Sequence, residues 1–127
     1  MKLTFKPAAS GLAGALFGVG PWPSWVREIG AASGVYVIRD KLSGRVLYVG
    51  ESHTGRLRKT LLRHFQQWSG KTAGKTYNRG SVEVCVLKVS PGRAVRLQNF
   101  LIVELQPRDN SISPAGVLKE PAGSDPF

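Results

Sequence analysis

Two tyrosines lie in neighbouring stretches that are rich in β-branched and aromatic residues. Residues 34–39 read GVYVIR and residues 45–50 read RVLYVG, and the polar loop DKLSG at 40–44 is typical of a hairpin. If the residues flanking this loop pair with each other, Tyr36 lies directly across from Tyr48 on the same face of the sheet. A phenol titrates near about pH 10, so it serves as a base only where nearby cations lower its pKa. The pattern therefore predicts two adjacent phenols that need positive neighbours to do chemistry.

Such neighbours follow in the next segment, which carries seven basic residues and no acidic residue between Ser52 and Arg79. They are Arg56, Arg58, Lys59, Arg63, Lys71, Lys75 and Arg79. The whole chain has 18 Lys and Arg against 8 Asp and Glu, a net charge of +10, which in a small domain usually faces a polyanion. A solvated face that only aids solubility is the alternative. Clustering in one segment favours phosphate binding.

The first part of this segment is predicted to be a helix from Arg56 to Ser69. Its apolar residues recur at a spacing of four, four and three, which forms one stripe on a helix; they are Leu57, Leu61, Phe65 and Trp68. We expect the opposite side to be a basic face, formed by Arg56, Lys59, Thr60, Arg63 and His64.

The remaining elements follow from the same periodicities. Alternating valines predict a third strand at Ser81–Val89, with Cys85 as a small apolar residue in it. A helix is predicted at Gly92–Leu105, capped by Ser90 and begun by a proline. The expected fold is a small α/β domain with a three-stranded antiparallel sheet flanked by helices.

The expected domain organisation has three parts. Residues 1–33 form a lead-in that packs on the domain and includes a short helix at Ser24–Ile29, with Ser24 as its cap. Residues 34–110 form the domain, and 111–127 form a flexible C-terminal tail because they are rich in Pro, Gly and Ser.

Several function classes are disfavoured. The loop SGKTAGKT has Ser69 where a phosphate-binding loop needs Gly, and a predicted helix rather than a strand precedes it. A single cysteine excludes an internal disulfide and a multi-cysteine zinc site. No apolar run approaches the roughly 18 residues that span a bilayer. We expect no membrane partner and a reducing, cytoplasmic location.

The hairpin motifs GVY at 34–36 and YVG at 48–50 resemble the paired motif of the GIY-YIG nuclease family. Glu51-Ser52 with Arg56-Leu57 is similar to the start of the family's first helix, with its arginine, and His64-Phe65 is similar to the histidine that closes it. LQNFLI at 97–102 and PRDN at 107–110 resemble the last helix and its terminal asparagine. The resemblance covers about residues 33–110, with these motifs in the family's order.

The resemblance implies a DNA endonuclease that hydrolyses phosphodiester bonds with Mg²⁺ or Mn²⁺. It implies that Tyr36 or Tyr48 assists proton removal from water, that Arg56 clamps the scissile phosphate, and that His64 hydrogen-bonds to the water or the phosphate. Arg63 is the alternative to Arg56. Asn110, with the basic residues of the segment from Arg56 to Arg79, is expected at the DNA, and its alternative role is to cap the turn after the last helix.

One position departs from this family. Gln98 stands where the family carries its metal-ligating glutamate, and Glu104 cannot replace it because six residues turn a helix by about 240°. Hard divalent cations favour charged oxygen ligands, so we expect weakened or absent catalysis. The alternatives are a non-catalytic nucleic-acid-binding module derived from such a nuclease, or a protein-interaction domain that faces an acidic partner. Whether Gln98 is natural or introduced stays open.

Overall fold

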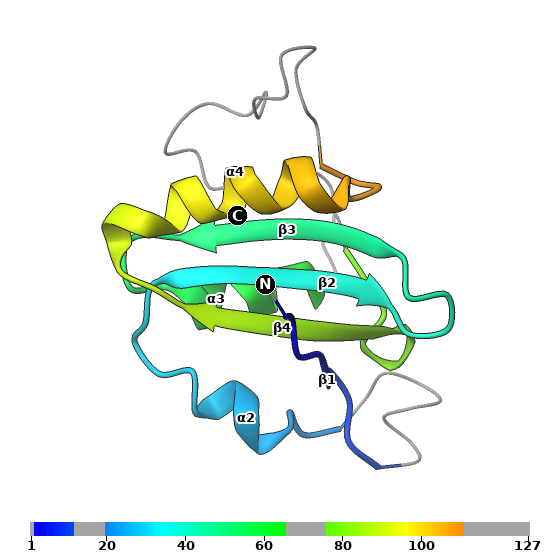
Figure 1. Ribbon diagram of the computed structural model, residues 1–127. Coiled ribbons are helices and arrows are strands. Elements are labelled where there is room, and N and C mark those ends of the chain that lie inside the picture. Colours follow the sequence, from blue (N-terminus) through cyan, green and yellow to red (C-terminus); the bar gives the residue numbers. More distant parts are fainter. Residues whose placement is uncertain (1, 12–19, 66–75, 111–127) are drawn as a thin grey trace, which may run out of the picture.

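The protein is a small α/β domain built on a four-stranded antiparallel sheet. The computed structural model describes residues 2–11, 20–65 and 76–110 (Figure 1). The strands are β1 (Lys6–Pro7), β2 (Gly34–Asp40), β3 (Val46–Ser52) and β4 (Val82–Lys88), in the order β1-β4-β2-β3. The helices are α2 (Ser24–Arg27), α3 (Leu57–Leu62), which continues into a 3₁₀ turn at Arg63–Phe65, and α4 (Pro91–Leu105); a second 3₁₀ turn at Arg79–Ser81 precedes β4. No helix among the described residues is long and apolar enough to cross a bilayer.

The expected sheet of three strands is wrong by one strand. Lys6 pairs with Val84 and Pro7 pairs with Glu83, so a two-residue strand from the lead-in covers part of the β4 edge. A strand of two residues is too short to show an alternating pattern in the sequence. Proline is tolerated in an edge strand because its missing N–H can face away from the neighbouring strand. The sequence pattern therefore carried no signal for β1.

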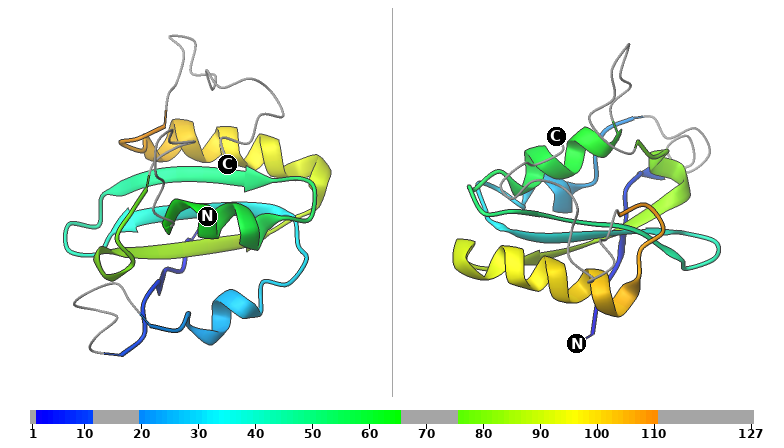
Figure 2. Two further views of the ribbon diagram at one scale, coloured as in Figure 1. Left: turned by 180° about the vertical axis from the view of Figure 1, so that it is seen from behind. Right: turned by 90° about the horizontal axis from the view of Figure 1, so that it is seen from above.

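The two faces of the sheet are covered by different helices. In the right-hand view of Figure 2, α3 and α4 lie on opposite sides of the strands. The α3 side buries Tyr36, Ile38, Leu47, Tyr48, Leu57, Leu61, Val82 and Val84, with Ala8 and Ile29 from the lead-in. The α4 side buries Val35, Val37, Val49, Cys85, Leu101 and Ile102. Residues 35–38 of β2 alternate between these two cores, as a pleated strand requires, whereas Leu47 and Tyr48 of β3 both lie in the core on the α3 side.

The hairpin register differs from the prediction. Tyr36 pairs with Gly50, and Tyr48 pairs with Ile38, so the two tyrosines are not directly opposed. The register shifts by one residue between Ile38 and Arg39, where Arg39 pairs with Val46. A displacement of two residues keeps both side chains on one face. The two phenols are therefore still neighbours on one face, as predicted, although the predicted register is wrong.

The prediction for the first helix is also wrong in part. Arg56 and Lys59 are exposed as expected, but Thr60 and His64 are buried, at 4% and 0% exposure. His64 follows Leu57 by seven residues, which is close to two full turns, so it lies on the same stripe as Leu57 rather than opposite it. Residues 66–69 of the predicted helix lie outside the described residues.

The helix starts are correctly located, but the expected side-chain caps are not made. Ser90 precedes α4 and Pro91 is its first residue, yet the Ser90 side chain makes no capping bond. Pro23 precedes α2, so Ser24 is the first helical residue rather than its cap. α4 ends at Gln106, whose φ of 46° is left-handed.

After this turn the chain runs beside the β3 edge. The Arg108 N–H donates to the Val46 carbonyl (3.1 Å) and the Asp109 N–H donates to the Leu47 carbonyl (2.9 Å). The segment that follows α4 is thereby fixed against the strand that carries Tyr48.

Candidate nucleic-acid site

Three motif residues meet in a buried cluster on the α3 side of the sheet. The hydroxyl of Tyr36 and Nε2 of His64 are 2.7 Å apart, although 28 positions separate them in sequence. The His64 ring lies 4.5 Å from the Tyr48 ring, and the two tyrosine rings are stacked at 6.3 Å with an angle of 23°. Tyr36, Tyr48 and His64 are 1%, 4% and 0% exposed. Strands β2 and β3 and the 3₁₀ turn after α3 thus contribute one side chain each.

Gly50 makes room for this arrangement. A Cβ at position 50 would lie 2.3 Å from both Cζ and the hydroxyl oxygen of Tyr36, far inside van der Waals contact. The Tyr36 ring therefore crosses directly over its cross-strand partner. The glycine of the YVG motif is required here because the phenol occupies the space of a side chain.

Tyr77 joins the cluster from the segment before β4. Its ring lies 5.9 Å from the His64 ring, and its N–H donates to the His64 carbonyl (2.7 Å). Its hydroxyl donates to Oδ2 of Asp109 (2.8 Å). Burial, followed by the bond to this carboxylate, raises the pKa of Tyr77 well above its ordinary value. We name Tyr36, Tyr48, His64 and Tyr77 the ring cluster.

Sequence reasoning missed Tyr77 and did not single out Asp109. The two residues lie 32 positions apart, and no local period links them. The only available signal was the place of Asp109 in the PRDN motif.

Asn110 serves the β3 edge in this structure. Its Nδ2 donates to the Val49 carbonyl (2.9 Å), and the Val49 N–H donates to its Oδ1 (2.8 Å). An amide side chain thus takes the place of a neighbouring strand's backbone. Contact between Asn110 and DNA stays a prediction.

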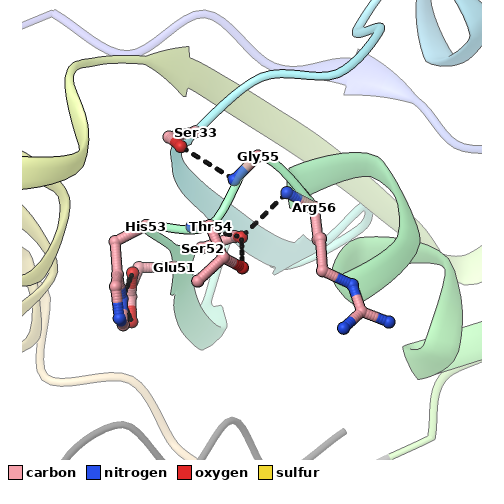
Figure 3. A network of polar contacts seen from close by, with 7 residues as sticks. All are labelled: Ser33, Glu51, Ser52, His53, Thr54, Gly55 and Arg56. Carbon is pink, nitrogen blue, oxygen red and sulfur yellow. Dashed lines mark hydrogen bonds and ion pairs between the residues drawn. The ribbon is translucent and has the colours of Figure 1, made fainter.

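The end of β3 and the loop that leads to α3 are held by main-chain N–H groups that donate to serine side chains, and we name residues 51–56 the loop site (Figure 3). Oγ of Ser52 accepts the Arg56 N–H at 3.1 Å and the Thr54 N–H at 3.4 Å. Oγ of Ser33 accepts the Gly55 N–H at 3.0 Å. Arg56 therefore enters α3 from a fixed main chain while its own side chain is exposed.

The loop site also contains a hydrogen-bonded pair of side chains that sequence reasoning missed. Nδ1 of His53 lies 3.1 Å from both carboxylate oxygens of Glu51. The His53 side chain is 39% exposed and that of Glu51 is 15% exposed. The two residues are two positions apart in sequence, a spacing that has many ordinary causes, so no pattern identified them.

The predicted basic residues fall into different environments. Arg58 and Lys59 are exposed on α3, and Arg63 is half-buried. Lys71 and Lys75 lie outside the described residues.

Arg79 differs from these because its guanidinium binds the lead-in. It donates to the carbonyls of Ala8 (3.1 Å), Gly20 (2.9 Å) and Pro21 (3.0 Å) and lies 3.7 Å over the Trp22 ring. Burial lowers the pKa of Arg79. These contacts use three of the five N–H donors of the guanidinium. Contact between Arg79 and DNA stays a prediction.

Gln98 lies apart from the ring cluster. It is 8% exposed, and it is three and four residues before Leu101 and Ile102, which pack against the opposite face of the sheet. Its amide is neutral, whereas Mg²⁺ and Mn²⁺ favour carboxylates. Within residues 2–11, 20–65 and 76–110, no three His, Cys, Asp or Glu residues are grouped so as to hold a metal ion. Gln98 itself offers such an ion only a neutral amide oxygen.

Comparison of the chain with protein-family models gives no match, and comparison with curated proteins gives none either.

Proposed function

We propose that this chain binds DNA along α3 and the loop site and hydrolyses a phosphodiester bond there, as a weakened endonuclease of GIY-YIG type. The observation that carries the proposal is the 2.7 Å contact between Tyr36 and His64. It joins two of the sequence motifs that resemble this family, and Tyr48 of a third motif packs against the same imidazole. Free Cys85 is in keeping with a cytoplasmic location.

Arg56 is the proposed phosphate ligand. A guanidinium presents paired donors that match two phosphate oxygens, and it stays charged throughout the reaction. Arg58 and Lys59 continue the exposed positive surface along α3. Phosphodiester hydrolysis gathers charge on the non-bridging oxygens, so a fixed cation at the scissile phosphate lowers the barrier. Arg63 contributes from the end of the same surface.

A second function, a DNA-binding module without catalysis, is favoured by a separate observation. Tyr36, Tyr48 and His64 are almost wholly buried, and the metal position carries a neutral amide. In that case the ring cluster stabilises the fold, and the basic surface of α3 binds phosphates without cutting them.

Cleavage assays separate the two functions. Single-stranded, duplex and branched DNA are incubated with the protein in Mg²⁺ or Mn²⁺, beside the variant Gln98→Glu and the neutral control Gln98→Met. If position 98 holds the family's metal, the glutamate variant gains activity on the order of a hundredfold, because a bound cation removes several kcal/mol from the barrier. The methionine control gains nothing. Equal cleavage rates for the wild type and both variants would show that the metal ligand lies elsewhere. Binding of DNA without cleavage by all three proteins would support the DNA-binding module without catalysis.

The salt dependence of binding tests the DNA-binding part alone. Neutralised phosphates release counterions, so the dissociation constant should rise steeply between about 50 and 200 mM salt. A flat response would exclude binding through the basic surface.

A further inference from the structure

The proposed reaction needs a base that can reach a water molecule beside a DNA phosphate. The tyrosines and His64 are at most 4% exposed, and the Tyr36 hydroxyl already contacts His64. His53 is 39% exposed and lies three residues before Arg56, in the same loop. Of these groups, His53 is the one that solvent and a bulky polyanion can approach.

The contact with Glu51 prepares His53 to accept a proton. Glu51 belongs to β3 and pairs with Val35, so the sheet fixes its backbone. Its carboxylate accepts a hydrogen bond from the Nδ1–H of His53, with 3.1 Å between Nδ1 and each oxygen. An imidazole held in this tautomer has its lone pair on Nε2, the atom that faces away from the carboxylate. A carboxylate of this kind orients the ring and stabilises the imidazolium that forms.

The pair belongs to the same short loop as the proposed phosphate ligand. Ser52 lies between Glu51 and His53 in sequence, and its Oγ accepts the N–H of Arg56. In the view of Figure 3 the side chains of Glu51, His53 and Arg56 extend to the same side of the loop. One short segment thus offers a base, its orienting carboxylate and a cation.

We propose that His53 is the general base of this site and that Glu51 is its positioning residue, an inference that rests on the proposed function. Nε2 of His53 takes a proton from water while the water oxygen forms a bond to phosphorus. The bond from phosphorus to one ester oxygen breaks, and that oxygen takes a proton from solvent. Arg56 neutralises the non-bridging oxygens. The products are a phosphate monoester and an alcohol, and the imidazolium returns its proton to solvent.

The test measures cleavage of labelled DNA by the full chain in EDTA, under single-turnover conditions. His53→Gln should lower the rate on the order of a hundredfold, the size of a general-base contribution, while DNA affinity stays within about twofold. Added imidazole should restore part of the activity of His53→Gly. Leu42→Ala, a change at an exposed residue of the loop between β2 and β3, is the control and should cut at the wild-type rate.

The role of Glu51 is tested by a measurement that would not change if Glu51 only stabilised the fold. Nitrogen-15 NMR of wild-type His53 should show the tautomer protonated at Nδ1, and Glu51→Gln should give a mixture of tautomers with a lower rate at unchanged affinity. A wild-type tautomer protonated at Nε2 overturns the role of Glu51.

The remaining outcomes separate the two claims. If the wild type cuts DNA and His53→Gln cuts it equally fast, the inference fails and the proposed function stands. A wild type that cuts no DNA, with or without metal, overturns both.

Discussion

The loop site lies between two residues of the ring cluster in sequence, Tyr48 and His64, but the two regions differ in which polar groups a ligand can reach. In the ring cluster, Tyr36 and His64 satisfy each other in the interior. In the loop site main-chain N–H groups donate to serine side chains, and the side chains of His53 and Arg56 reach solvent. The tyrosines and His64 therefore form part of the domain interior, whereas the proposed function assigns DNA contact to His53 and Arg56. Substitutions in the two regions should accordingly change different quantities.

The largest effect is expected from Arg56→Ala in the loop site. Removing the cation that neutralises the scissile phosphate should lower the cleavage rate by about 10² to 10³, while most of the DNA affinity and the free energy of unfolding remain. Single-turnover cleavage and a binding titration measure both quantities. Arg58→Ala is the matched control and should weaken binding without slowing the bound enzyme. An Arg56→Ala protein that cuts at the original rate would move the role to Arg63.

Gly50→Ala tests the ring cluster. The new methyl group would overlap the Tyr36 ring, so the free energy of unfolding should fall by about 3 kcal/mol, measured by urea denaturation. Gly92→Ala is the control, because nothing lies within 4 Å of the added Cβ, and it should stabilise α4 by up to about 1 kcal/mol. Equal stabilities for the two variants would contradict the close packing of Tyr36 on Gly50.

Tyr36→Phe removes one hydrogen bond from a wholly buried histidine. We expect a loss of about 1 to 2 kcal/mol in the free energy of unfolding, with little change in DNA affinity of the folded protein. Urea denaturation and a binding titration at the same temperature measure the two effects. A tenfold loss of affinity at unchanged stability would instead indicate that the phenol contacts DNA.

The smallest effect is an alkaline loss of stability caused by Tyr77. Its pKa is raised in the folded protein, so above about pH 10 the unfolded chain loses a proton that the folded chain keeps. The unfolded state then binds fewer protons, and the free energy of unfolding falls as the pH rises. Tyr77→Phe should show a shallower fall between pH 9 and 11 in thermal denaturation. Parallel curves for the two proteins would show that Tyr77 is not the cause.

Local sequence patterns determined much of this fold. The β-branched and aromatic residues of GVYVIR and RVLYVG predicted β2 and β3, and valine alternation predicted β4. The start and end of α4 were predicted to within one residue, because a proline can begin a helix and a proline after it prevents continuation. The proximity of Tyr36 and Tyr48 was also predictable, since strand period decides the face even where the register is displaced.

Contacts over long separations were decided by the tertiary structure. The burial of His64 against Tyr36, the use of Arg79 to bind the lead-in and the pairing of Asn110 with Val49 each join segments at least 28 residues apart. β1 needed the exposed edge of β4 before two residues could become a strand. A period of two or 3.6 fixes the type and face of an element, because neighbouring residues alone set it. Which polar atoms meet depends on how distant elements pack, and no local spacing contains that information.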